Sequence, residues 1–217
     1  MHLILLNQYY PPDAAPTGVM LKSVAESLAE SGHEVTVVSS SSGYGELTKE
    51  KGESGKVKGA RVNVVRLRAF SFGRGSFIGK ILDYLSYYLG VALYLLMNRA
   101  DKVVALTTPP YLSVLARVMT KLRGGRHAHW VMDLYPDVMF AHGMLDEQSL
   151  KAKVLKKVAA FGFGGDRSDG VLVLGPDMKL ALERYVSVKS QESLVNGECQ
   201  RPMVDWVPLW SSAAADS

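Results

Sequence analysis

Cysteine is almost missing from this chain, which has one, Cys199, among 217 residues. A single cysteine excludes a disulfide framework within the chain and a zinc site made of several cysteine thiolates. A reducing compartment is the simplest setting for such a composition, so we expect a cytoplasmic protein.

Charged residues are also few, at 21% of the chain, and neither sign dominates strongly. Because 47% of the residues are hydrophobic, a sizeable core can form and disorder is disfavoured. The formal net charge is +4, yet no run of lysines and arginines resembles a nucleic-acid-binding arm. The mild basic excess fits either an ordinary solvated surface or attraction to anionic lipid headgroups.

Long hydrophobic runs are missing as well. The N-terminal run LILL is short and lacks a basic segment before it and a cleavage site after it, so no signal peptide is expected. Residues 77–99, from Phe77 to Arg99, are very apolar, but their longest uncharged run falls short of the ~20 residues that span a bilayer. They indicate either a core-packed helix or an interfacial helix, and Tyr87, Tyr88 and Leu95 are the candidate lipid contacts.

Apolar strand-like runs alternate with helical patterns along the whole chain. This alternation predicts an α/β fold, a Rossmann-like doubly wound parallel sheet with helices on both faces. The expected strands are residues 2–6, 34–40, 61–67, 102–106, 127–132, 171–174 and 204–208, and helices are expected at 18–31, 77–99, 111–122, 150–163 and after 176. The polar stretch 41–59 is expected to be a surface excursion, and 211–217 a linker or tail.

The loop after the first predicted strand reads NQYYPPDAAPTG and contains one glycine, Gly18. A nicotinamide-binding domain would show G-x-G-x-x-G at this point, so a dehydrogenase is disfavoured. Thr17 and Gly18 stand where a helix begins, and free N–H groups at a helix N-terminus favour an anion. Thr17 could equally be a plain N-cap.

Ligands of open parallel sheets bind outside the carboxyl ends of the strands. That rule selects the loops at residues 9–18, 107–110, 133–137 and 175–177. In the third of these, Asp133 and Asp137 flank Tyr135 and Pro136. The two carboxylates could orient hydroxyl groups or act as a base, or one could merely cap the next turn.

The histidines give little evidence of a site. His33 follows a helix-ending glycine and is interpreted as structural, and His127 and His129 alternate within a strand without metal-ligand spacing. His142 lies after the aspartate loop and could reach it. No metal site and no Ser/His/Asp arrangement is indicated.

Four segments together resemble the family 4 retaining glycosyltransferases of the GT-B fold: NQYYPPD, SLAESGHEVTVVSS, VVALTTPPYLSVLA and WVMDLYPDVMFAHGML. The branch that they resemble most is fucosaminyl-transferase-like and builds bacterial surface polysaccharides. The resemblance implies two Rossmann-like domains, with residues 1–210 as the N-terminal acceptor-binding domain. The donor-binding domain, with its Glu-x7-Glu motif, is not within these residues, so the chain alone is expected to be inactive.

The resemblance also implies a reaction. A sugar would pass from a nucleotide-diphosphate donor, with retention, to a saccharide acceptor that is often polyprenyl-linked at the inner face of the cytoplasmic membrane. No cofactor beyond that co-substrate is implied. Asp133 would be catalytic, Thr17 and Gly18 would approach the donor, Thr107 and Thr108 would contact the acceptor, and Tyr135 and Asp137 would line the centre.

Two departures from the family pattern are visible. Ala14, Ala15 and Pro16 stand where many members have a glycine pair, and Met132 stands where many have a histidine, so a histidine-based role is not expected. A different class of function is also compatible with the sequence, namely a non-catalytic membrane- or partner-binding module. A third possibility is one subunit of a split glycosyltransferase.

Overall fold

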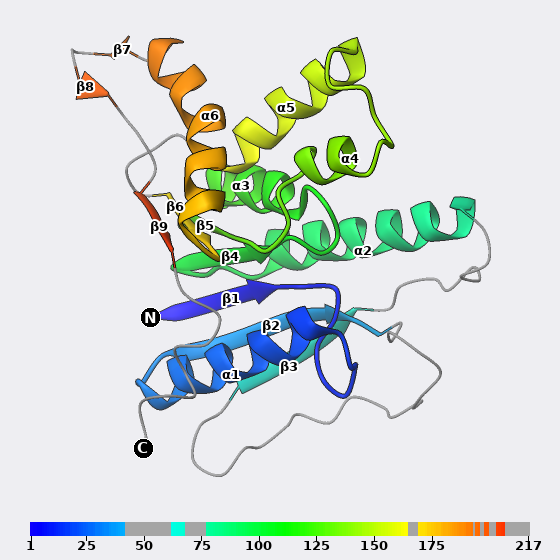
Figure 1. The fold of residues 1–217 in the computed structure, drawn as a ribbon. Coiled ribbons are helices and arrows are strands. Elements are labelled where there is room, and N and C mark those ends of the chain that lie inside the picture. The colour runs from blue at the N-terminus through cyan, green and yellow to red at the C-terminus, as the bar shows by residue number, and fades with distance from the viewer. Residues whose placement is uncertain are drawn as a thin grey trace, which may run out of the picture.

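The computed structural model describes residues 1–41, 62–67, 77–164, 169–192, 194–195, 198–199 and 203–206. Seven of its strands form one parallel sheet: β1 (His2–Leu6), β2 (Glu34–Ser40), β3 (Val62–Leu67), β4 (Lys102–Leu106), β5 (Arg126–Val131), β6 (Gly170–Val173) and β9 (Met203–Trp206). Their order is β3-β2-β1-β4-β5-β6-β9, so the direction of strand addition reverses between β1 and β4 (Figure 1). The predicted α/β fold class is therefore confirmed.

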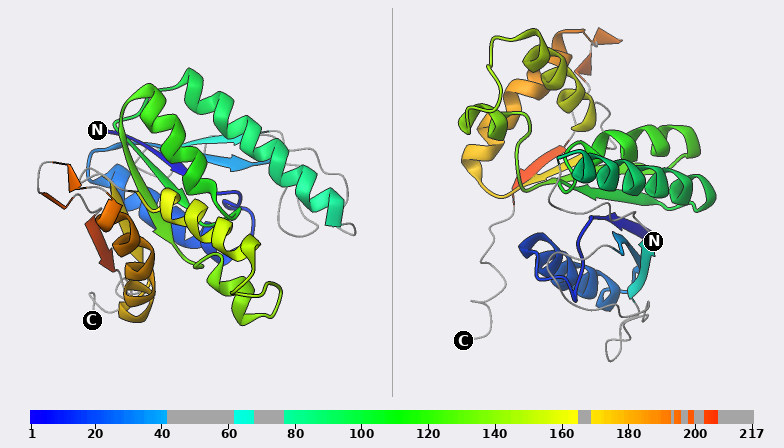
Figure 2. Two further views of the ribbon diagram at one scale, coloured as in Figure 1. Left: turned by 90° about the horizontal axis from the view of Figure 1, so that it is seen from above. Right: turned by 90° about the vertical axis from the view of Figure 1, so that its right-hand side faces the viewer.

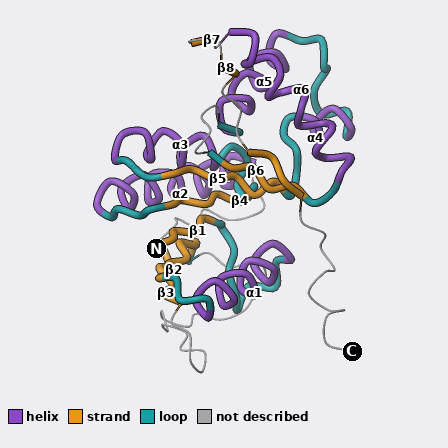
Figure 3. The backbone as a smooth tube through the Cα atoms, turned by 90° about the vertical axis from the view of Figure 1, so that its left-hand side faces the viewer, coloured by secondary structure: helices purple, strands orange, loops and turns teal. Residues whose placement is uncertain are grey.

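The helices are α1 (Pro16–Glu30), α2 (Phe77–Met97), α3 (Leu112–Arg123), α4 (Asp137–Ala141), α5 (Leu150–Gly162) and α6 (Pro176–Glu192). Helix α1 lies on one side of the sheet, and α2 and α3 lie on the other (Figures 2 and 3). Helices α4, α5 and α6 gather beyond β5 and β6, where α6 packs against β6 and β9.

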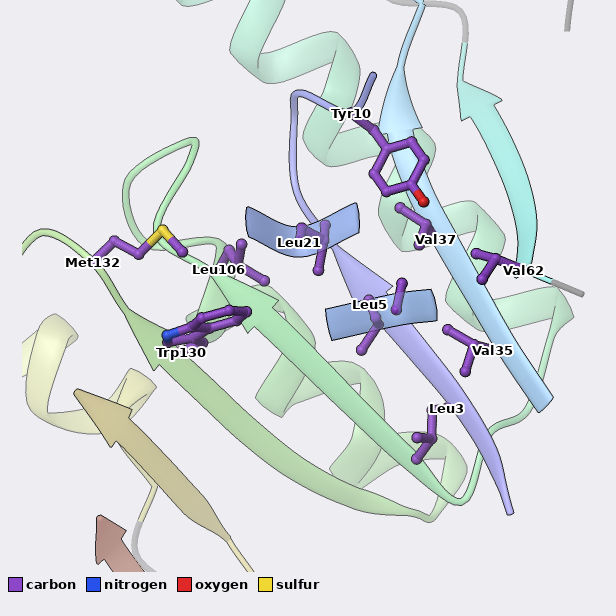
Figure 4. Close-up of a cluster of buried hydrophobic side chains, with 11 residues drawn as sticks. Leu3, Leu5, Tyr10, Leu21, Val35, Val37, Val62, Leu106, Trp130 and Met132 are labelled. Atoms are coloured by element: carbon purple, nitrogen blue, oxygen red, sulfur yellow. The ribbon is translucent and has the colours of Figure 1, made fainter. Parts of the chain in front are cut away.

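The sheet separates two of the three core clusters, because successive side chains of a strand point to opposite faces. Leu3 and Leu5 of β1 pack with α1, and Figure 4 shows Leu21 of α1 within this cluster. Ile4 and Leu6 of the same strand pack with α2 and α3 instead. The continuous apolar run of β1 is thus explained by burial on both faces.

Helix α2 has two unlike faces. Tyr87, Val91 and Leu95 are at most 3% exposed and pack on the sheet, whereas the opposite face leaves several leucines exposed. Within the described residues no helix is both long and apolar enough to cross a bilayer. Tyr87 and Leu95 were candidate lipid contacts; that assignment is wrong, because both side chains belong to the core.

Several local predictions differ from the structure. Helix α1 begins two residues before Gly18, and its N-cap is Ala15, so Thr17 is not the cap. Tyr111 precedes α3 in a left-handed conformation, with φ 65°. The short helix α4 and the small hairpin of β7 (Leu194–Val195) and β8 (Glu198–Cys199) were not anticipated. The predictions for residues 42–59 and 211–217 lie outside the described residues.

Candidate functional site

The carboxyl ends of the strands bring the predicted site loops together. The backbone N–H of Gln8, just after β1, donates to the carbonyl of Thr108 after β4 at 2.9 Å. The carbonyl of Gln8 accepts from the N–H of Ser40 at the end of β2, also at 2.9 Å. Backbone hydrogen bonds therefore connect the ends of β1, β2 and β4, which are far apart in sequence.

A buried asparagine fixes the loop after β1 to the start of α1. Asn7 is fully buried, and its Nδ2 donates to the carbonyl of Tyr9 at 2.7 Å and to Thr17 Oγ1 at 3.3 Å. Its Oδ1 has no hydrogen-bond partner among the described residues. Thr17 thus receives a bond from the interior, while its side chain is only half-buried.

Gly18 is required by a close approach of two backbones. A Cβ at this position would lie 3.0 Å from the carbonyl oxygen of Tyr9 and 3.2 Å from the Cα of Tyr10. Glycine therefore lets the first loop fold directly onto the first turn of α1. Whether this helix start also meets a donor phosphate stays a prediction.

Arg66 is a residue of this region that the sequence did not reveal. It lies near the end of β3, and its Nη2 donates to the carbonyl of Pro11 at 2.5 Å and to that of Tyr10 at 3.4 Å. Its Nη1 also lies 4.0 Å from the buried carboxylate of Asp13. Arg66 of β3 therefore holds the loop after β1 in place. The sequence pattern could not reveal this role, because it depends on contacts between residues far apart in the chain.

Thr107 joins the loops after β4 and β5. Its buried Oγ1 accepts from the N–H of Met132 at 2.8 Å and from the N–H of Asp133 at 3.4 Å, and it donates to the carbonyl of Trp130 at 3.4 Å. One donor and two acceptor sites are all that a hydroxyl offers. Thr107 therefore positions the backbone at Asp133, and the predicted contact from Thr107 to an acceptor stays a prediction.

The aspartate loop presents its two carboxylates differently. Asp133 is exposed at the carboxyl edge of the sheet, and Asp137 is half-buried at the first turn of α4. The hydroxyl of Tyr185, from α6, donates to Asp137 Oδ2. Burial, together with that bond, raises the pKa of Tyr185 well above its ordinary value.

Two tyrosine rings lie at the aspartate loop. Tyr135 lies with its ring centroid 6.3 Å from that of Tyr111, at a tilt of 52°. Partial burial, followed by the negative charge of Asp133, raises the pKa of Tyr135, while burial and the neighbouring Tyr135 raise that of Tyr111 to about 12. These hydroxyls therefore stay protonated at neutral pH and can donate hydrogen bonds.

A cavity of about 280 Å³ opens beside Asp137. Its walls come from α4, α5 and α6 and from the segment before α5. It is lined by two carboxylates, three cationic side chains, an alanine and a phenol: Asp137, Glu147, Lys156, Lys157, Arg184, Ala160 and Tyr185. Lys156 Nζ donates to Glu147 Oε1 at 2.6 Å, so one cation is paired within the wall. This mixture of donors and acceptors suits a polyhydroxylated ligand.

The buried histidines do not belong to this site. His127 and His129 point into the core between α3 and α5, and His129 stacks on Phe163 at 5.5 Å. Burial lowers the pKa of both to about 3, with smaller effects from Arg117 on His127 and from His127 on His129. Both are neutral at physiological pH and are structural. His142 is exposed at the end of α4.

No cluster of three or more metal-ligating side chains occurs in the described parts of the chain. Asp133 and Tyr135 lie on the loop after β5, and Asp137 begins α4. Thr107 and Thr108 follow β4, and Thr17 and Gly18 lie in the first turn of α1.

Residues 17–195 match the family model described as glycosyl transferase 4-like domain. The fold is similar to that in the crystal structure of LpCGTa in complex with UDP, with a TM-score of 0.50 and 14% sequence identity. The match covers 95% of this chain and 52% of that one, so this chain spans about half the length of that protein. No curated protein sequence matches the chain.

Proposed function

This chain belongs to the glycosyl transferase 4-like domain family, and we propose that it is the acceptor-binding domain of a glycosyltransferase. Its donor would be a nucleoside diphosphate sugar, in keeping with the UDP of the structurally similar protein. We further propose that the acceptor is a lipid-linked saccharide of a bacterial surface polysaccharide, in a branch similar to the fucosaminyl transferases. The reaction would take place at the inner face of the cytoplasmic membrane.

The observation that supports this proposal most is the exposed carboxylate of Asp133, on a backbone fixed by Thr107 Oγ1. It stands at the carboxyl edge of a parallel sheet, where ligands of such sheets bind. Preorganised groups are effective in catalysis because no energy is spent on positioning them during the reaction.

The proposed transfer forms a bond between an acceptor hydroxyl oxygen and the anomeric carbon. The bond from that carbon to the nucleoside diphosphate breaks, and the diphosphate leaves with the bonding pair. Asp133 would accept a hydrogen bond from the attacking hydroxyl, orient it and take its proton as the new bond forms. Retention of configuration requires the acceptor to attack from the face that the diphosphate leaves.

The cavity beside Asp137 is the proposed seat of the acceptor saccharide. Its volume of about 280 Å³ lies near the lower end of the range for small-molecule pockets, ~300–1,000 Å³. Asp137, held by Tyr185, connects this cavity with the loop that bears Asp133. A sugar in the cavity would therefore lie beside the proposed reacting centre.

The donor would be held mainly by a second domain facing the same edge, on this chain's continuation or on a partner subunit. Thr17 and Gly18, at the start of α1, would then approach its phosphates. By itself the described domain should bind UDP weakly and transfer no sugar. Stoichiometric, tight binding of UDP in isothermal titration calorimetry would contradict this division of labour.

The test of the catalytic assignment is Asp133→Asn, made in the enzyme that contains both domains. We expect kcat to fall at least about a hundredfold, as is typical for the loss of a general base. Unfolding by urea should be unchanged, because the side chain is exposed. Glu30→Gln, at the far end of α1, is the matched control and should retain full activity. Near-normal turnover of the Asp133 variant would refute the assignment.

A non-catalytic membrane- or partner-binding module is the second candidate function. The exposed apolar face of α2 favours it, because the proposed chemistry at Asp133 does not by itself explain that face. The two candidates separate on one measurement: a module would retain its cellular function with Asp133→Asn, whereas an enzyme would lose it.

A further inference from the structure

Exposed hydrophobic side chains are concentrated on α2. Seven of the fifteen large ones found exposed in the described residues lie on this helix: Ile81, Leu82, Leu85, Leu89, Leu93, Leu96 and Met97. Leu85 and Leu89 are 61% and 60% exposed, and Met97 is 81% exposed. Scattered single leucines on a surface are ordinary, but a set gathered on one helix indicates an interaction surface.

The spacing places these side chains on one face. Residues 81, 85, 89 and 93 follow each other at intervals of four, so they form a ridge along the helix. The stretch from 81 to 97 is about 24 Å long at the usual rise per residue. The opposite face, with Tyr87, Val91 and Leu95, is buried on the sheet, so burial of the core does not explain the outer leucines. We call the seven exposed residues the α2 ridge.

Basic side chains adjoin the C-terminal end of the α2 ridge. A cavity of about 940 Å³ at the amino edge of the sheet is lined by Arg99, Arg123 and Arg126, together with the N-terminal Met1 and one carboxylate, Asp101. Arg99 is two residues from Met97, and Arg123 follows the exposed Leu122 of α3. No ion pair of these three arginines occurs in the described residues. We call them the arginine cluster.

We propose that the α2 ridge and the arginine cluster together form a docking surface for an anionic lipid bilayer. A bilayer offers an apolar layer and anionic headgroups side by side, which is the combination that this surface complements. The ridge is the convex outer side of a helix and not a groove, so it suits a planar partner. Helix α2, which bears the ridge, packs on one face of the sheet, and its N-terminal end extends past the carboxyl end of β1 (Figure 1).

The proposed docking also orients the site. Tyr88 of α2 donates its hydroxyl hydrogen to the carbonyl of Pro110, and Tyr84 is close enough to Tyr135 to affect its pKa. The N-terminal half of α2 therefore borders the loops after β4 and β5. If the proposed function holds, a lipid-linked acceptor would reach Asp133 from the membrane alongside this helix. The docking itself does not depend on that function.

The experiment is co-sedimentation of the 217-residue chain with vesicles. One set is phosphatidylcholine alone, and the other contains equal parts of phosphatidylcholine and phosphatidylglycerol. The ridge variant is Leu85→Gln, Leu89→Gln and Leu93→Gln together. Its matched control makes the same change at three exposed apolar residues of α5 and α6, Leu150, Val154 and Leu180.

We expect the wild-type chain to sediment with the anionic vesicles and much less with the neutral ones. The ridge variant should lose binding to both by about a hundredfold or more, since burying each leucine side chain is worth about 1.5–3 kcal/mol. The control should bind like the wild type. Circular dichroism and thermal unfolding should show that both variants are folded, since all six side chains are exposed.

The arginine cluster is tested separately with Arg123→Gln and Arg126→Gln, against Lys151→Gln and Lys153→Gln as a control with the same charge. The arginine variant should bind anionic vesicles about thirtyfold more weakly, because each basic side chain at such a surface contributes about 1 kcal/mol. Binding to neutral vesicles should not change. The lysine control should bind anionic vesicles as the wild type does.

Three outcomes would overturn the proposal. The first is a wild-type chain that does not sediment with anionic vesicles, and the second is a ridge variant that binds as well as the control. The third is a wild-type dimer in sedimentation velocity that the ridge variant does not form, with no vesicle binding by either protein. In that case a second copy of the chain, and not a bilayer, would cover the α2 ridge. None of these results bears on Asp133, so the two proposals fail independently.

Discussion

Thr107 Oγ1 accepts a hydrogen bond from the backbone N–H of Met132 at 2.8 Å, across the ends of two neighbouring strands. The same oxygen accepts from the N–H of Asp133 at 3.4 Å. One buried hydroxyl thus fixes the point at which β5 turns into the aspartate loop. The geometry of the proposed catalytic residue therefore depends on a residue from another strand.

Thr107→Val removes that hydroxyl with little change of shape. We expect the free energy of unfolding to fall by about 1–3 kcal/mol, because buried N–H groups lose their acceptor. Urea denaturation measures the change. Thr107→Ser retains the hydroxyl and should lose less stability. Equal stability of the valine variant and the wild-type protein would show that this hydrogen bond does not stabilise the fold.

Gly18→Ala should destabilise the chain by about 1–3 kcal/mol, because the new Cβ would meet the backbone of Tyr9 at 3.0 Å and the first loop must move. Gly90→Ala in α2 is the matched control. There the nearest neighbour is the terminal methyl of Leu67 at 3.2 Å, a side chain that can yield, and alanine favours the helix by about 1 kcal/mol. Urea midpoints should therefore separate the two variants, and similar midpoints would contradict the contact at Tyr9.

Tyr185→Phe removes the donor to Asp137 Oδ2. If Asp137 contacts the acceptor, the variant enzyme should show a raised KM for the acceptor, with kcat changed less, because binding and not chemistry is weakened. Steady-state kinetics of the two-domain enzyme test this. Tyr111→Phe is the control, since its buried hydroxyl has no partner among the described residues and its removal should be nearly neutral for stability.

Stability should decline in acid because of His127 and His129. Burial lowers the pKa of each histidine from 6.5 to about 3. Between these pH values the two histidines are therefore protonated in the unfolded chain but stay neutral in the folded chain. Stability is thus fully present above about pH 6.5 and is lost as the pH falls towards 3, at up to about 1.4 kcal/mol per histidine for each pH unit.

Urea midpoints over that range measure the slope. A His127→Gln, His129→Gln variant should show a shallower slope than the wild type, even if it is less stable at neutral pH. His142→Gln, at an exposed position, should retain the wild-type slope. An unchanged slope in the double variant would assign the acid sensitivity to other groups.

The sequence pattern predicted the position of the helix at residues 77–99 but not its surroundings. Residues 77–99 were predicted to form one helix, and α2 spans Phe77–Met97. The pattern could not decide between a core-packed and an interfacial helix, because leucines and tyrosines occur on all sides. The structure places Tyr87 in the core and leaves Leu89 exposed, so core packing of one face is confirmed and the interfacial role of the other stays a prediction.

The position of the candidate loops at one edge was predictable from sequence, because the chain direction in a parallel sheet places the ends of successive strands at the same edge. The partners of those loops were not. Arg66 reaches Pro11 across 55 residues, and Tyr185 reaches Asp137 across 48. Thr17 was a possible cap by composition, but the helix starts earlier because Pro16 fits its first turn.

By itself, the sequence determined the fold class, the elements and the edge of the sheet where chemistry can occur, since these follow from local apolar periodicity and chain direction. Only the tertiary structure decided that Thr107 is enclosed while Asp133 is exposed, that two histidines are neutral core residues, and that α2 keeps an apolar ridge beside three arginines. These properties depend on which distant side chains share a space, and local patterns do not contain that information.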